Sequence, residues 1–223
     1  MTRQLPLDLP FAPAYGRADF IADDSNEAAL AWIERWPEWP GPALVLAAPP
    51  GCGKTHLLHI WAARSEASIV DGHGLATLDP AVRRVAIDNA QRMAGDRAAE
   101  EALFHLYNRL AVQRGFLLLA AASPPARWQL ALRDLASRLR AAPVAEIALP
   151  SDTLLETIIV KLCSDRQLVL APRVLQYVVR RMERSADAAR RIVAGLDRAA
   201  LADKAPVTIE RARAVLAAAG MEA

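Results

Sequence analysis

ALVLAAPPGCGKTHLLHIWAARSEA, residues 43–67, contains three patterns in succession. The first, ALVLAA (43–48), is a continuous apolar run bounded by proline and glycine, which is typical of a strand buried on both faces. The last, HLLHIWAARSEA (56–67), is typical of a helix. Between them, APPGCGKTH (48–56) supplies glycines that let backbone N–H groups turn inward around an anion. This order of strand, loop and helix predicts a P-loop, which binds the phosphates of a nucleotide.

The residues of this loop have defined chemical roles. The Lys54 ammonium can reach the β- and γ-phosphates, and the Thr55 hydroxyl can hold Mg²⁺. The strict pattern has glycine where Ala48 stands, so the loop departs from it at one position. The alternative interpretation is a glycine-proline loop that contains Lys-Thr by coincidence. We expect the nucleotide to be bound by Gly51, Cys52, Gly53, Lys54, Thr55 and His56.

A second acidic group is expected at the end of another buried strand. VAIDNA (85–90) provides Asp88 after an apolar run, and its carboxylate would hold the same Mg²⁺ through water. The alternative is a purely structural aspartate at a strand end. Asn89 follows, where many ATPases of this type have a carboxylate that activates water. Because an amide can orient water but cannot accept its proton, we expect intrinsic ATP hydrolysis to be weak or absent.

The alternation of short apolar runs and helical stretches continues along the chain. We predict further strands within ASIVDG (67–72), RRVAIDNA (83–90), GFLLLAAA (115–122) and VAEIAL (144–149). Helical patterns cover residues 25–36 and 97–113. Strands and helices that alternate in this way predict an α/β fold with a parallel sheet covered by helices.

The pattern changes at Pro150. Four amphipathic helical stretches follow it, and no strand pattern remains. We therefore expect an extended tail at 1–12, an α/β nucleotide-binding domain at 13–150 and a small all-helical lid domain at 151–223.

Composition excludes several classes of protein. The 223 residues are 53% hydrophobic. The 27 Lys and Arg residues nearly balance the 25 Asp and Glu residues, and they are scattered along the sequence, which argues against a dedicated nucleic-acid surface. Two cysteines far apart in the sequence fit a reducing compartment. No signal peptide is recognisable, and the longest uncharged apolar runs are too short and too rich in proline to cross a bilayer. We expect a cytoplasmic protein with no membrane contact.

The segment QLPLDLP (4–10) sets leucine at every second position between prolines. Pro6 and Pro10 remove two backbone donors, so the segment is an edge strand or an extended tail and not a central strand. Its leucines either pack on this protein's own sheet edge or enter a partner's groove, where extended peptides place alternate side chains in pockets.

The order of these motifs resembles the AAA+ module of bacterial DnaA-type replication initiators. The P-loop, the IDN strand end, the Pro-Pro turn at 124–125 and the helical lid carry this resemblance. More narrowly, IDNAQRMAGD (87–96), FHLYNRL (104–110) and DLASRL (134–139) resemble the Hda family, which are shortened regulatory relatives of the initiator. The resemblance covers nearly the whole chain and implies an AAA+ P-loop NTPase fold.

The resemblance also implies a partner for the tail, because the Hda family begins with a QLxLxL motif that binds the sliding clamp. The partner would be the β subunit of DNA polymerase III. Such a motif places an amide in a polar sub-pocket and leucines in an apolar one. The corresponding residues are Gln4, Leu5, Leu7 and Leu9.

Further site residues follow from the same resemblance. Arg138 in DLASRL matches the arginine finger, which would reach a nucleotide on a neighbouring subunit and act in catalysis there, and Arg133 is placed to assist. DFIADDSN (19–26) resembles the stretch that lines the adenine pocket, so Phe20 and Ile21 would flank the base. Their alternative role is core packing.

One departure concerns the lid. Asp187 stands where the initiators carry the lid arginine called sensor 2. Arg190 and Arg191, about one turn further on, either replace it or are lid-surface residues.

The implied function is that of a regulatory adaptor. It would bind ADP or ATP with Mg²⁺, dock on the sliding clamp and stimulate ATP hydrolysis by DnaA, so that an origin does not fire again. No helix-turn-helix DNA-binding domain is recognisable after the lid, and a homo-oligomer is possible. The alternative is an ATP-driven AAA+ loader or remodeller in DNA replication, and a third reading is a small-molecule P-loop kinase.

Overall fold

A computed structural model describes residues 15–71, 75, 78–203 and 205–221. Five strands form one sheet in the order β2-β3-β4-β1-β5, and every neighbouring pair is parallel. The parallel sheet predicted from the sequence is therefore confirmed. The strands are β1 (Ala43–Ala47), β2 (Ser68–Val70), β3 (Arg84–Ile87), β4 (Phe116–Ala121) and β5 (Val144–Glu146).

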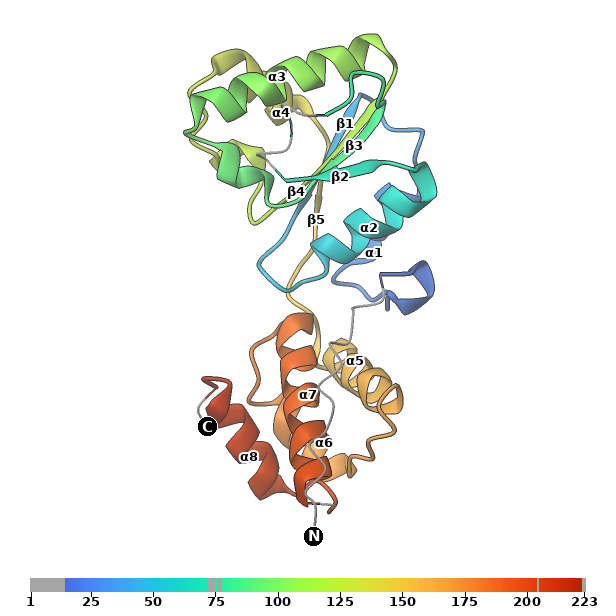
Figure 1. Cartoon of the computed structure of the whole chain (residues 1–223), viewed down its shortest axis with the longest axis vertical. Coiled ribbons are helices and arrows are strands. Elements are labelled where there is room, and N and C mark those ends of the chain that lie inside the picture. The colour runs from blue at the N-terminus through green and yellow to red at the C-terminus, as the bar shows by residue number, and fades with distance from the viewer. Residues whose placement is uncertain (1–14, 72–74, 76–77, 204, 222–223) are drawn as a thin grey trace, which may run out of the picture.

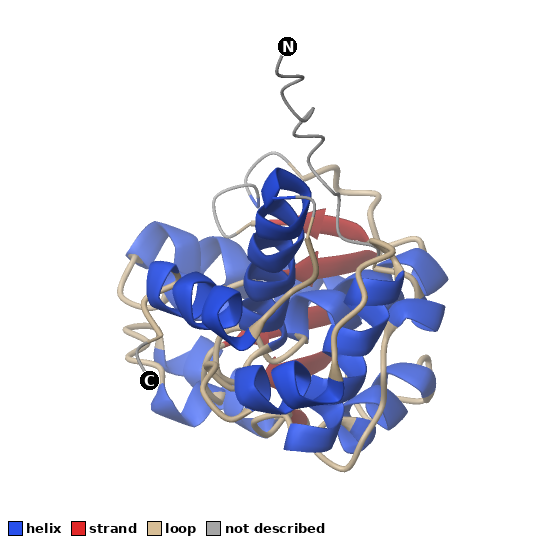
Figure 2. Ribbon diagram, turned by 90° about the horizontal axis from the view of Figure 1, so that it is seen from below, coloured by secondary structure: helices blue, strands red, loops and turns tan. Residues whose placement is uncertain are grey.

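Helices cover both faces of the sheet, as Figures 1 and 2 show. They are α1 (Glu27–Glu34), α2 (Lys54–Ser65), α3 (Arg97–Val112) and α4 (Arg133–Ala141). Alternate residues of a strand point to opposite faces. Accordingly, Leu44 and Leu46 of β1 pack with α1 and α2, whereas Ala43 and Val45 pack with α3 and α4.

Short 3-10 helices connect several elements. They are η1 (Arg17–Asp19), η3 (Ala90–Met93) and η4 (Pro125–Arg127). Helix α2 begins at Lys54, two residues before the helical pattern recognised in the sequence. Strand β5 ends at Glu146, three residues before the end of the predicted run, although the Ile147 N–H still donates to the Ala47 carbonyl oxygen of β1 at 2.9 Å.

Four helices follow the sheet and pack around a separate apolar core. They are α5 (Asp152–Ser164), α6 (Pro172–Val179), α7 (Ala186–Asp203) and α8 (Ile209–Ala218). Figure 1 places them at one end of the long axis, and α3 and α4 at the other. Within the described part of the chain, no helix is long and apolar enough to span a membrane.

Candidate nucleotide-binding site

The loop between β1 and α2 turns at two glycines with positive φ. Gly51 has φ 74° and Gly53 has φ 96°, a conformation that residues with a Cβ rarely adopt. The Lys54 side chain folds back into this loop, where its ammonium donates to the carbonyl oxygens of Ala48 (2.7 Å) and Pro49 (2.8 Å). Burial lowers the pKa of Lys54, because the charged form loses its hydration. The loop thus holds a buried cation on its inner side.

Thr55 and Asp88 meet although 33 residues separate them. The Thr55 hydroxyl donates to Asp88 Oδ2 at 2.8 Å. The backbone N–H of Asn89 donates to Asp88 Oδ1 at 2.7 Å, and Asn89 itself is exposed with φ 53°. A hydroxyl and a carboxylate are the oxygen ligands that Mg²⁺ prefers. The structure therefore brings together the two side chains expected to hold the metal ion.

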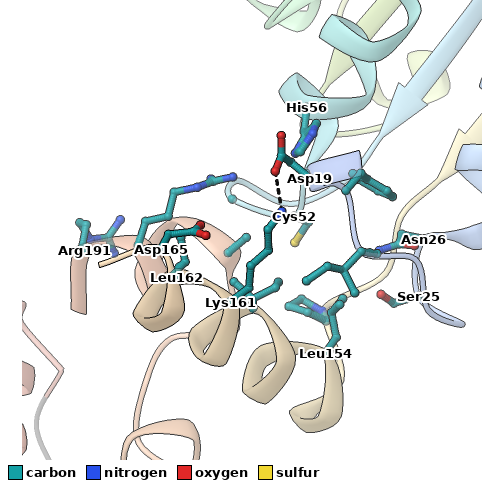
Figure 3. Close-up of a pocket in the computed structure, with 18 of the residues that line it drawn as sticks. Asp19, Ser25, Asn26, Cys52, His56, Leu154, Lys161, Leu162, Asp165 and Arg191 are labelled. Atoms are coloured by element: carbon teal, nitrogen blue, oxygen red, sulfur yellow. Dashed lines mark hydrogen bonds and ion pairs between the residues drawn. The ribbon is translucent and has the colours of Figure 1, made fainter. Parts of the chain in front are cut away.

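A pocket of about 400 Å³ lies between the P-loop, the segment before α1 and the helices α5 and α7 (Figure 3). Its walls combine apolar side chains of α5 with backbone of the P-loop, a combination that suits a base and ribose next to phosphates. Six of the residues predicted to bind a nucleotide line it, namely Phe20, Ile21, Gly51, Cys52, Gly53 and His56. Burial raises the pKa of the Cys52 thiol, which keeps it neutral.

His56 fastens the segment before α1 onto the P-loop helix. Its Nε2 lies 2.9 Å from the carbonyl oxygen of Gly16, and its ring meets the ring of Phe20 edge-on at 5.2 Å. Tyr15 stacks on His59, one turn further along α2, at 4.3 Å. Burial lowers the pKa of His56. Phe20 is thereby held beside the P-loop.

An ion pair that the sequence did not reveal bridges the same pocket. Lys161 of α5 binds the Asp19 carboxylate at 2.6 Å, and both side chains line the pocket (Figure 3). The hydrogen bond from Lys161 lowers the pKa of Asp19. The two residues are 142 positions apart, so no local pattern signals the contact.

Helix α7 begins directly on the P-loop. The Ala186 amide donates to the Gly51 carbonyl oxygen at 2.9 Å. In the first turn of α7, Asp187 pairs with Arg190 at 2.6 Å, and Arg191 pairs with Glu183 at 3.2 Å. Arg190 and Arg191 both line the pocket, which places them where either could approach a phosphate.

Arg138 lies elsewhere, on the exposed side of α4. Its guanidinium lies over the rings of Phe104 (5.4 Å) and Tyr107 (5.6 Å) of α3. Arg133, at the start of α4, is also exposed. Among the residues described, none from α4 contributes to the wall of the pocket. Gln4, Leu5, Leu7 and Leu9 lie outside the described residues.

The geometry fits an adenine nucleotide with Mg²⁺. The P-loop amides and Lys54 would hold the phosphates, Thr55 and Asp88 would hold the ion, and Phe20 and Ile21 would flank the base. Bound Mg²⁺ would neutralise phosphate charge. Asn89 follows Asp88 directly and binds its carboxylate through the backbone N–H, and a side-chain amide at this position can orient a water molecule but cannot take a proton from it.

No protein-family model matches the sequence. Domain III of the replication initiation protein DnaA from Thermotoga maritima is 18% identical, with a TM-score of 0.82 over 94% of this chain and 98% of that one. AMPPCP-bound DnaA from Aquifex aeolicus is 19% identical, with a TM-score of 0.70 over 86% of this chain and 69% of that one. The RuvB Holliday junction branch migration motor from Thermotoga maritima is 18% identical, with a TM-score of 0.73 over 92% of this chain and 72% of that one.

These likenesses establish the fold. The parallel sheet with helices on both faces is that of an AAA+ P-loop NTPase, as the sequence predicted.

Proposed function

We propose that this chain is a regulatory AAA+ adaptor that binds adenine nucleotide and the sliding clamp of DNA polymerase III, and stimulates ATP hydrolysis by the replication initiator DnaA. Residues 13–150 serve as its nucleotide-binding domain and residues 151–223 as its lid. Once its ATP is hydrolysed, the initiator no longer starts replication at the origin. The protein acts in the cytoplasm and docks on the clamp through residues 4–9.

The position of Arg138 carries this proposal. Helix α4 packs on the face of the sheet opposite α2, and it lies at the end of the molecule away from α5–α8 (Figure 1). The guanidinium of Arg138 is therefore remote from the nucleotide pocket of its own chain. An exposed arginine of this kind can act only on a phosphate that another molecule presents, where it neutralises charge that develops during phosphoryl transfer.

The chain's own site supports binding more than turnover. Asn89 follows Asp88 where a general base would be needed, and Asp187, which pairs with Arg190, stands at the start of α7 where the resemblance implies an arginine that contacts the phosphates. Both features disfavour fast hydrolysis of a nucleotide in this pocket. The nucleotide is then a structural ligand that fixes the active shape of the adaptor.

The test is ATP hydrolysis by the initiator, with and without this protein, in the presence of clamp loaded on DNA. Wild-type protein is expected to stimulate hydrolysis, and Arg138→Ala is expected to abolish the stimulation while it leaves nucleotide binding by this chain intact. Arg140→Ala is the matched control, because Arg140 is also exposed on α4. Stimulation that persists with Arg138→Ala contradicts the proposal.

The likeness to RuvB favours one alternative, an ATP-driven loader or remodeller that works through its own hydrolysis. Turnover by the protein alone separates the two functions. A motor hydrolyses ATP at rates near the enzyme norm of about 1–1000 per second, whereas the adaptor is slow alone and potent only with initiator and clamp.

A further inference from the structure

Glu100 is a fully buried carboxylate in the first turn of α3. It accepts hydrogen bonds from the backbone amides of Gly95 (2.8 Å), Ala131 (3.1 Å) and Leu132 (2.8 Å). Burial alone would raise the pKa of Glu100, but the three amide hydrogen bonds outweigh burial and lower it. The carboxylate is thus kept ionised inside the protein by backbone donors.

These three amides belong to two segments, one that precedes α4 and one that follows η3. Leu132 is the residue that precedes α4, the helix that carries Arg138. Gly95 follows η3, which begins directly after Asn89 at the end of β3. Glu100 therefore joins the turn that follows η3 to the beginning of α4. Its partners before α4, Ala131 and Leu132, lie 31 and 32 residues further along the chain.

The same face of α3 also supports Arg138 directly. Residues at positions i, i+4 and i+7 of a helix lie on one face, and Glu100, Phe104 and Tyr107 have this spacing. Glu100 holds the start of α4, and the two rings lie under the guanidinium of Arg138 about two turns later. Helix α4 is therefore fixed to α3 at two points.

We propose that Glu100 is a positioning residue. It sets the position and direction of α4 relative to α3, and thereby the position of the Arg138 guanidinium. This inference rests on the proposed function, in which Arg138 acts on a phosphate held by the initiator. A group that acts on a transferring phosphate must be placed accurately, since a displacement of about 1 Å can cost about 100-fold in rate. A buried carboxylate with three backbone donors resists such a displacement.

The experiment compares Glu100→Gln with wild type, Arg138→Ala and the control Glu101→Gln. Glutamine has the shape of glutamate, but its amide nitrogen is a donor, so at least one backbone amide loses its acceptor. Glu101 is the neighbouring residue, and its carboxylate pairs with Arg97 at 2.9 Å on the surface. The Glu101 variant therefore removes a negative charge from the same turn of α3 without touching α4.

Two measurements are made on each variant. The first is the maximal stimulation of initiator ATP hydrolysis and the adaptor concentration that gives half of it. Glu100→Gln is expected to lower the maximum by about 10- to 100-fold and to leave the half-saturating concentration unchanged, because Glu100 is buried and touches no partner. The second is hydrogen exchange of the Ala131 and Leu132 amides in the protein alone, expected to rise on the order of tenfold.

The outcomes separate this inference from the proposed function. If Arg138→Ala abolishes stimulation and Glu100→Gln matches wild type in both measurements, the role of Glu100 is refuted. If Arg138→Ala stimulates normally, the proposed function fails, and hydrogen exchange at Ala131 and Leu132, at least one of which loses its acceptor, decides whether Glu100 fixes α4. A loss of apparent affinity with an unchanged maximum would also contradict a positioning role.

A second variant covers the case in which Glu100→Gln does not fold. Leu132→Pro removes one of the three donors and keeps the carboxylate. The φ of Leu132 is −84°, which is close to the range that proline adopts. This variant must show the same lowered maximum at an unchanged half-saturating concentration, and wild-type behaviour from it would overturn the inference.

Discussion

Gly51→Ala is expected to separate the P-loop from the beginning of helix α7. A Cβ at this position would lie 2.6 Å from Ser185 Cβ and 2.9 Å from Ser185 Oγ. Gly51 also has φ 74°, where a residue with a Cβ is strained by about 1–2 kcal/mol. Relief of the overlap adds about 1–3 kcal/mol. The free energy of unfolding should therefore fall by about 2–5 kcal/mol in total.

Gly220→Ala is the matched control. Gly220 has the same φ of 74°, and an added Cβ there meets nothing within 4 Å. This variant is expected to lose only the strain contribution of about 1–2 kcal/mol. Urea denaturation of both variants gives the difference between them, which reports the contact between Gly51 and Ser185 alone.

Ser185→Gly in the Gly51→Ala background completes a double-mutant cycle. Ser185 Oγ accepts from the Ala188 amide at 3.1 Å in the first turn of α7, and replacing this capping serine by Gly alone costs only about 0.3–0.5 kcal/mol. Because the double variant has no overlap, its loss of stability should be smaller than the sum of the two single losses by about 1 kcal/mol or more. Equal losses for the Gly51 and Gly220 variants, together with an additive cycle, would refute the seating of α7 on the P-loop.

Three further predictions concern the pocket and the tail. Lys54→Ala should weaken adenine-nucleotide binding by about 10- to 100-fold in a calorimetric titration, and unchanged affinity in a folded variant would exclude the P-loop interpretation. The pKa of His56 lies below its ordinary value of 6.5, so the unfolded chain takes up the proton first as the pH falls, and wild-type stability declines below that value. The free energy of unfolding of His56→Gln should decline less than that of the wild type between about pH 7.5 and about pH 5.5, with a difference in slope of at most about 1.4 kcal/mol per pH unit. Identical slopes for the two proteins would contradict burial of a neutral imidazole. Replacement of Gln4, Leu7 and Leu9 by Ala should abolish clamp binding in a pull-down and leave the free energy of unfolding unchanged, whereas a loss of several kcal/mol would assign the leucines to this protein's own core.

The sequence predicted those parts of the fold that depend on neighbouring residues. The run 43–48 is apolar throughout because β1 is covered on both faces, and the glycines that follow are needed for positive φ. The strand order was not predicted, because strands separated by whole helices pair in the sheet. The contact between Asp19 and Lys161 was not predicted for the same reason, since only the tertiary fold brings α5 to the segment before α1.

Glu100 shows what could have been recognised and was not. In RAAEEAL it stands next to Glu101, and the two residues look alike as members of a polar helix start. Their positions on the helix differ, because Glu100 lies three residues before Leu103 and ten before Leu110, on the buried stripe of α3. A charge on an apolar stripe predicts a buried hydrogen-bonded carboxylate. Its partners at 131–132 could not be named without the structure.

The stacking of Tyr15 on His59 limits how far a clamp bound to residues 4–9 would lie from this protein. Residues 10–15 connect that ring to Leu9, and six extended residues cover at most about 20 Å. A clamp that holds Leu9 would therefore lie within about 20 Å of the P-loop helix, which is less than the width of a small domain. Such a short tether leaves the bound protein little freedom to rotate.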